Sequence, residues 1–151
     1  MTLFYRVLIL LSFCTQAFAG APLWTFTPLT ATTLTVPANA TATVQYQVTN
    51  QSFRSHTLMV RPMAGVTQLT TGFGICSNPF MLAGNASCVL SLQITGSALT
   101  QPISGGPVVC TQGSMLQCYQ PSPADALHIT QEAVSGAIIN VSGSPLSLST
   151  N

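Results

Sequence analysis

The sequence predicts an all-β domain, on the strength of three observations. Polar and apolar residues alternate along several segments, no long window outside the N-terminal segment has helical apolar spacing, and turn residues recur at short intervals. The longest alternation is 41–49, in which Ala42, Val44, Tyr46 and Val48 occupy one face. A strand with one buried face produces this pattern, and a helix does not.

Segment 88–95 repeats the alternation and predicts a second strong strand, with Cys88, Leu90, Leu92 and Ile94 facing the core. Weaker strands are expected at 33–36, 56–61 (with Leu58 and Val60 inward), 66–69, 107–110 and 126–130. Turn residues separate them at 37–39, 50–52, 83–85 and 105–107. About seven short strands in about 110 residues predict an immunoglobulin-like β-sandwich.

Residues 1–19 are expected to be a cleavable signal peptide. Arg6 precedes the apolar run 7–11, which continues through Phe13 and Cys14. The small residues Ala17 and Ala19 precede the expected cleavage before Gly20. The apolar run is too short to span a bilayer, so a membrane anchor or a buried helix is the weaker interpretation. A lipoprotein signal would place a small residue before the cysteine, where Phe13 stands.

Export therefore places the protein in the periplasm, on the cell surface or outside the cell, with no transmembrane anchor after cleavage. The folded domain is expected to span 20–132. Residues 133–151 are rich in Ser and Gly and carry no charge. They are interpreted as a tail, or as an extra strand around 137–141.

Four cysteines follow the predicted signal: Cys76, Cys88, Cys110 and Cys118. An even number in an exported chain indicates disulfides, and four cysteines allow three pairings. Short loops between extended segments favour Cys76–Cys88 and Cys110–Cys118, the local disulfides of the predicted sandwich. Zinc is disfavoured, because the sequence has no Cys-x-x-Cys and an oxidising compartment opposes thiolate ligation.

Charged side chains are scarce, at 3% of the chain. After the predicted cleavage only Arg54, Arg61, Asp125 and Glu132 remain. Without a basic stripe, counterion release cannot drive nucleic-acid binding, and an electrostatic hold on anionic lipid is disfavoured too. Neutral Thr, Ser, Gln and Asn side chains must provide most contacts with water.

No catalytic or cofactor-binding residue is expected, and the protein is not predicted to be an enzyme. Asp125 and Glu132 are the only carboxylates, and neither a nucleophile elbow nor a phosphate-binding glycine loop occurs. Soft or imidazole ligands for copper are present at His56, Met59, Met63, Met81, Met115 and His128. They form no tight cluster in the sequence, so no metal site is predicted from them.

Three stretches carry a family resemblance. Segment 36–52 has a turn leading into a long strand that ends in Thr-Asn-Gln-Ser, and segment 76–92 joins Cys76 to an alternating strand opened by Cys88. Both resemble bacterial exported immunoglobulin-like domains, and segment 106–121 resembles part of repeat-bearing surface proteins. The resemblance implies a structural or adhesive module without an active site.

The leading hypothesis is therefore a non-catalytic interaction module of the envelope or extracellular space. Its partner would be a protein or another envelope component, held through strand edges and an uncharged Thr/Gln surface. The alternative is a periplasmic carrier or copper-handling protein that uses the Met and His residues.

Overall fold

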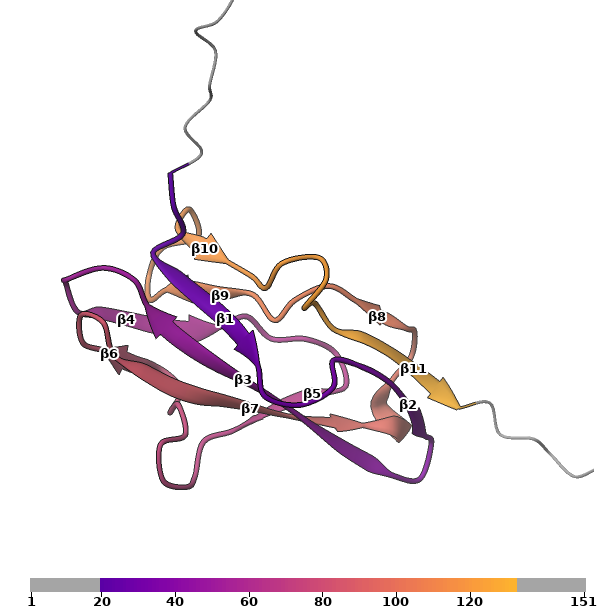
Figure 1. The fold of residues 1–151 in the computed structure, drawn as a ribbon. Helices are drawn as coiled ribbons and strands as arrows, with labels where there is room; N and C mark the ends of the chain where they lie inside the picture. Colours follow the sequence, from indigo (N-terminus) through magenta and orange to yellow (C-terminus); the bar gives the residue numbers. More distant parts are fainter. Residues whose placement is uncertain (1–19, 133–151) are drawn as a thin grey trace, which may run out of the picture.

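The computed structural model describes residues 20–132, which form an all-β sandwich (Figure 1). The predicted signal peptide, with Ala17 and Ala19, and the predicted tail 133–151 lie outside the described residues. In chain order the elements are β1 (Trp24–Pro28), β2 (Thr33–Pro37), β3 (Thr41–Asn50), β4 (His56–Val60), β5 (Val66–Leu69), β6 (Phe80–Leu82), β7 (Ser87–Thr95), the 3-10 turn η2 (Gly96–Ala98), β8 (Ile103–Ser104), β9 (Val109–Thr111), β10 (Cys118–Tyr119) and β11 (His128–Glu132).

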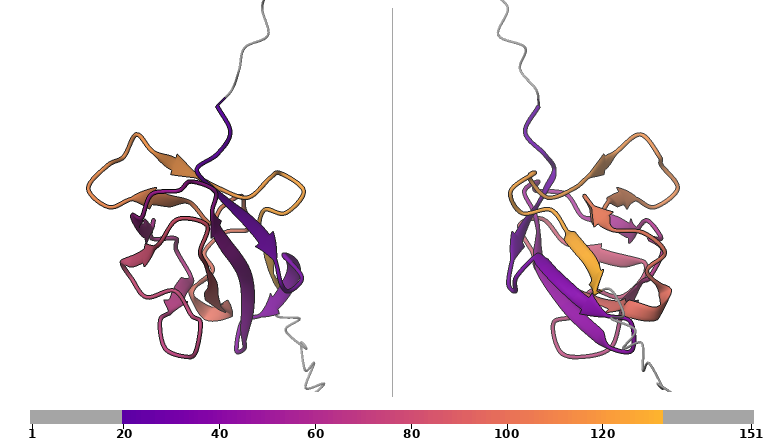
Figure 2. Two further views of the ribbon diagram at one scale, coloured as in Figure 1. Left: turned by 60° about the vertical axis from the view of Figure 1, so that its left-hand side comes forward. Right: turned by 90° about the vertical axis from the view of Figure 1, so that its right-hand side faces the viewer.

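The strands form three sheets, with the orders β1-β3-β7-β5, β10-β9-β4-β6 and β2-β11-β8. Neighbours are antiparallel, except that β2 and β11 run parallel. The order β1-β3-β7-β5 matches the A-B-E-D sheet of immunoglobulin-like sandwiches. In the facing layer, β4 corresponds to strand C, segment 103–111 to strand F and β11 to strand G. The views in Figure 2 show the first sheet facing the other two.

The core lies between these layers and is built on the two long strands β3 and β7. Val44 pairs with Leu92 and Tyr46 pairs with Leu90, and all four side chains are buried. Each fully buried aliphatic side chain contributes about 1.5–3 kcal/mol through removal of apolar surface from water. Leu58 and Val60 of β4 also point inward, so the period-two prediction is confirmed there too.

All seven predicted strands are present, with shifts at two of them. The strand expected at 107–110 begins at Val109, because Gly105 and Gly106 instead exchange backbone hydrogen bonds with Leu127. Because Leu127 is engaged in this contact, the last strand, which was expected at 126–130, begins only at His128 and forms β11 (His128–Glu132). The prediction missed β1, β6, β8 and β10. The last three have two or three residues, too few to show a period.

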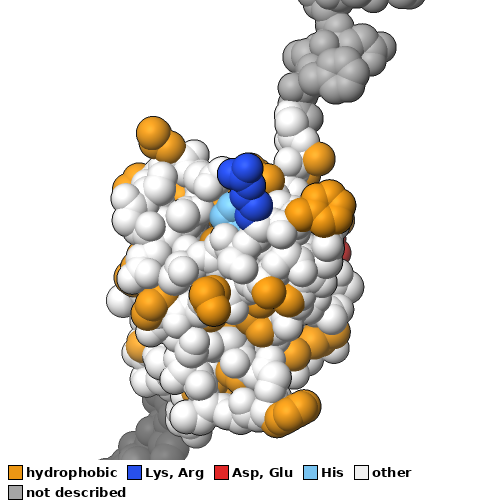
Figure 3. Space-filling view, turned by 90° about the vertical axis from the view of Figure 1, so that its left-hand side faces the viewer, with side chains coloured by type: hydrophobic (Ala, Val, Ile, Leu, Met, Phe, Trp, Pro, Cys, Tyr) orange, Lys and Arg blue, Asp and Glu red, His pale blue; other side chains and the backbone are white. Residues whose placement is uncertain are grey.

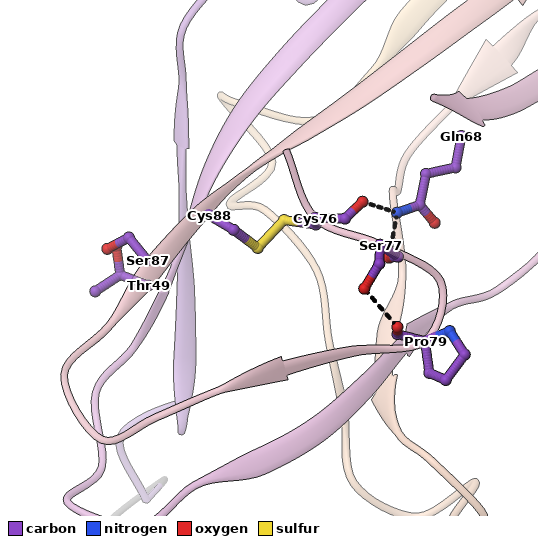
Figure 4. The surroundings of a disulfide bond; sticks show 7 residues. All are labelled: Thr49, Gln68, Cys76, Ser77, Pro79, Ser87 and Cys88. Carbon is purple, nitrogen blue, oxygen red and sulfur yellow. Dashed lines mark hydrogen bonds between the residues drawn. A yellow bond between two sulfur atoms is a disulfide. The ribbon is translucent and has the colours of Figure 1, made fainter. Parts of the chain in front are cut away.

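Both predicted disulfides are confirmed. Cys88 of β7 bonds Cys76, whose segment runs parallel to β7 through a bridge between Ile75 and Val89. The side-chain amide nitrogen of Gln68 donates hydrogen bonds to the backbone carbonyls of Cys76 and Ser77, and these bonds fix the segment against β5 (Figure 4).

The second disulfide joins Cys110 of β9 to Cys118 of β10, which stand directly opposite each other with a Cα–Cα distance of 4.0 Å. It therefore closes the β9–β10 hairpin. Within residues 20–132, no helix has the length and apolar character that a membrane span requires.

Candidate interaction surface

The outer face of the sheet β10-β9-β4-β6 carries exposed methionines on two of its strands. Because Leu58 and Val60 point into the core, Thr57 and Met59 point outward from β4. On β6, Phe80 and Leu82 are buried while Met81 is 72% exposed and stands opposite Thr57. Two methionines thus occupy outward positions that solvent-facing strands ordinarily give to polar residues.

A hollow of about 430 Å³ opens on this face. Met59 and Cys110 of the central strands, Arg61 and Pro62 after β4, and the turn 113–115 form its walls. We call it the Met59–Met115 hollow. Apart from the Arg61 side chain and the Ser114 hydroxyl, the side chains around it are apolar, which suits the binding of an apolar group.

The β9–β10 hairpin forms one side of the Met59–Met115 hollow and is held rigidly by local bonds. The Thr111 N–H donates to the Gln117 carbonyl at 3.0 Å, the two side chains are bonded at 2.9 Å, and the Ser114 N–H donates to the Thr111 carbonyl at 3.0 Å. Together with the Cys110–Cys118 disulfide, these bonds restrict the backbone of the turn, from which Met115 and Leu116 project with 71% and 99% exposure.

Arg61 gives the Met59–Met115 hollow a positive charge at its wall. The two carboxylates of the described chain are engaged or placed elsewhere: Asp125 accepts a hydrogen bond from the Ser122 hydroxyl at 2.7 Å, and Glu132 ends β11. Figure 3 shows one face of the molecule, on which separate apolar groups lie among uncharged polar groups and one basic side chain lies beside a histidine near the edge.

The six candidate copper ligands do not come together in one site. His56 contacts the Ser52 hydroxyl at 3.0 Å, and its ring centroid lies 5.9 Å from that of Trp24. His128 is exposed at the start of β11, and Met63 lines two other hollows. Of the candidates, Met59 and Met115 line the same hollow. Residues 20–132 hold no group of three or more His, Cys, Asp or Glu side chains placed for a metal.

Asp125 precedes β11, and Glu132 is the last residue of that strand. The Tyr46 hydroxyl donates to the backbone carbonyl of Asp125 at 2.8 Å. Burial, and secondarily the negative charge of Asp125, raises the pKa of the Tyr46 hydroxyl well above its ordinary value. Glu132 lies four residues beyond His128 on one strand, about 13 Å away along an extended chain.

The sequence interpretation did not single out Arg61, Pro62 or the turn 113–115 as a site. One signal was available: if Leu58 and Val60 face inward, Met59 and Arg61 face outward. A single outward hydrophobic residue is common on protein surfaces, so this signal alone does not identify a site; only a contiguous apolar patch does. No protein-family model matches this chain, and comparison with curated proteins finds no relative.

Proposed function

We propose that this chain is an exported, non-catalytic protein-interaction module of adhesion-like character, acting in the bacterial envelope or the extracellular space. The observation that carries the proposal is the Met59–Met115 hollow on a sheet face where solvent-facing strands ordinarily carry polar residues. Apolar hollows with few polar groups are typical of binding surfaces. The two disulfides support an oxidising compartment.

Cross-linking in the intact envelope tests the proposal. The chain contains no lysine, so amine-reactive reagents would miss the folded surface. A photoreactive phenylalanine analogue should instead replace Phe53, Phe73 or Leu116, which are almost fully exposed on three different loops. We expect a discrete adduct from at least one position. A monomer that forms no adduct from any of them would contradict the proposal.

The second candidate is a periplasmic carrier or copper-handling protein. The observation that favours it is the shared position of Met59 and Met115, whose thioethers are soft ligands suited to Cu(I). Titration of the disulfide-bonded protein with Cu(I) in acetonitrile tests it, because that solvent stabilises Cu(I) without a thiol reductant. Binding at micromolar metal that is lost in both Met59→Leu and Met115→Leu would support this function, and no binding would remove it.

A further inference from the structure

We propose that the Met59–Met115 hollow binds a polypeptide segment of a partner protein, with an apolar side chain inside the hollow and a neighbouring carboxylate on Arg61. This inference rests on the proposed function and names the site and the chemistry of the partner.

The apolar half of the recognition comes from Met59, Pro62 and Met115. Methionine side chains are flexible and polarisable, so they adapt to differently shaped apolar groups. At about 430 Å³, the hollow is large enough for a bulky aliphatic or aromatic side chain.

The charged half comes from Arg61. Asp125 and Glu132 lie on other parts of the fold, so the guanidinium is available to an external anion. Arg61 is exposed beside this apolar surface, where its guanidinium can bind a carboxylate of the partner through two parallel hydrogen bonds. The unusual scarcity of other charges makes this one cation a strong determinant of partner choice.

The extent of the apolar face favours a polypeptide over a small amphiphile. From Met81 on β6 to the hairpin on β10 the face crosses three strand spacings, about 14 Å. Leu116, in the β9–β10 turn next to Met115, is 99% exposed. A segment of several residues can cover this distance and can place separate side chains in the hollow, against Met81 and on Arg61.

The β9–β10 hairpin is also preorganised for binding. Its disulfide and its hydrogen bonds between Thr111 and Gln117 already restrict the loop. Little conformational entropy is lost when a partner docks on a surface of this kind, which raises affinity without additional contacts.

The test uses the full exported chain, disulfide-bonded, with ¹³C-labelled methionine methyl groups. The probes are two end-blocked synthetic peptides, Gly-Leu-Leu-Asp-Leu-Gly and its Asn counterpart. We expect the Asp peptide to shift the signals of Met59 and Met115 and not that of Met63, which lines other hollows. We expect it to bind about two- to fivefold more tightly than the Asn peptide.

Arg61→Gln should abolish the preference for Asp, while the matched control Arg54→Gln, on the β3–β4 loop, should retain it. Equal affinity for the two peptides, no methyl shift at millimolar peptide, or shifts confined to Met63 would overturn the inference. So would decanoate binding at Met59 more tightly than the Asp peptide, or self-association of the chain through Leu116. Photo-adducts from Phe53 or Phe73 alone would overturn it too and leave the proposed function standing.

Discussion

The indole nitrogen of Trp24 donates a hydrogen bond to the backbone carbonyl of Val109, 3.3 Å away. This bond joins β1 of the first sheet to β9 of the second. The Trp24 ring also packs edge-on against Tyr119, with centroids 4.8 Å apart. One fully buried side chain therefore holds the β9–β10 hairpin against the sandwich.

Trp24→Phe should destabilise the domain by about 1–3 kcal/mol, because the Val109 carbonyl loses its indole donor and the smaller ring packs less well. Urea unfolding followed by far-UV circular dichroism measures the change, since this substitution removes the chain's single tryptophan fluorophore. An unchanged midpoint would show that the bond between the sheets contributes nothing.

Asn50 is a second buried polar contact, and it organises the β3–β4 loop. Its side-chain amide nitrogen lies 2.8–3.2 Å from the carbonyl oxygens of Arg54, Leu82 and Ala83. Its side-chain oxygen accepts a hydrogen bond from the Ser52 N–H. Asn50→Ala should cost about 2–4 kcal/mol, because these buried groups lose their partners. Asn39→Ala, at an exposed turn position, is the control and should stay within about 0.5 kcal/mol of the unsubstituted protein.

The disulfide that closes the longer loop should contribute slightly more stability, because the entropy of loop closure rises with the logarithm of loop length. With sequence separations of 12 and 8, replacing each cysteine pair by serine should cost about 3 kcal/mol for Cys76–Cys88 and about 2.5 kcal/mol for Cys110–Cys118.

Loss of both disulfides approaches the whole stability of a small domain. Protein made in a reducing cytoplasm should therefore be poorly soluble, and equal yields and melting temperatures with and without the disulfides would refute this.

Gly96 leaves no room for a side chain. A Cβ there would overlap the carbonyl oxygen of Pro37, which belongs to the backbone and cannot move aside cheaply. Gly96→Ala should destabilise the domain by about 1–3 kcal/mol. Gly20→Ala, where nothing lies within 4 Å of the added carbon, is the matched control and should leave the thermal midpoint unchanged.

Tyr46 should make the fold sensitive to alkali. Burial raises the pKa of its hydroxyl in the folded protein, whereas an unfolded chain releases the proton near the ordinary value of about 10. The contribution of Tyr46 is thus complete below about pH 10 and declines as the pH rises above it. Free energies of unfolding at about pH 8 and about pH 11 should differ less in Tyr46→Phe; an equal difference would exclude Tyr46 as the cause.

The core and the disulfides could be predicted from sequence because local signals encode them. Tyr46 and Leu90 sit at alternating positions whose burial follows from the period alone. Cys110 and Cys118 are close in the chain, so short-loop closure favours the observed pair. β1 carries the same kind of signal in Trp24-Thr25-Phe26-Thr27, so it could have been predicted on the same grounds.

The Met59–Met115 hollow could not be predicted in this way. It exists because Met59 pairs with Cys110, which brings the hairpin turn beside β4. That register joins residues about fifty positions apart, and no local period contains it. The sequence indicated only that Met59 and Arg61 would face outward; which loop would lie beside them depends on the arrangement of the sheets.

The parallel pairing of β2 with β11 has a mechanical consequence. The described chain begins near β10 and ends beyond β11 at the opposite end of the sandwich (Figure 1). Tension applied between these ends would pull β2 and β11 in opposite directions along their length, from His128 opposite Thr33 to Glu132 opposite Pro37. The bonds between these strands would be loaded in shear and would have to rupture together, whereas peeling would break them one after another. The domain is therefore built to transmit a pull along its strands.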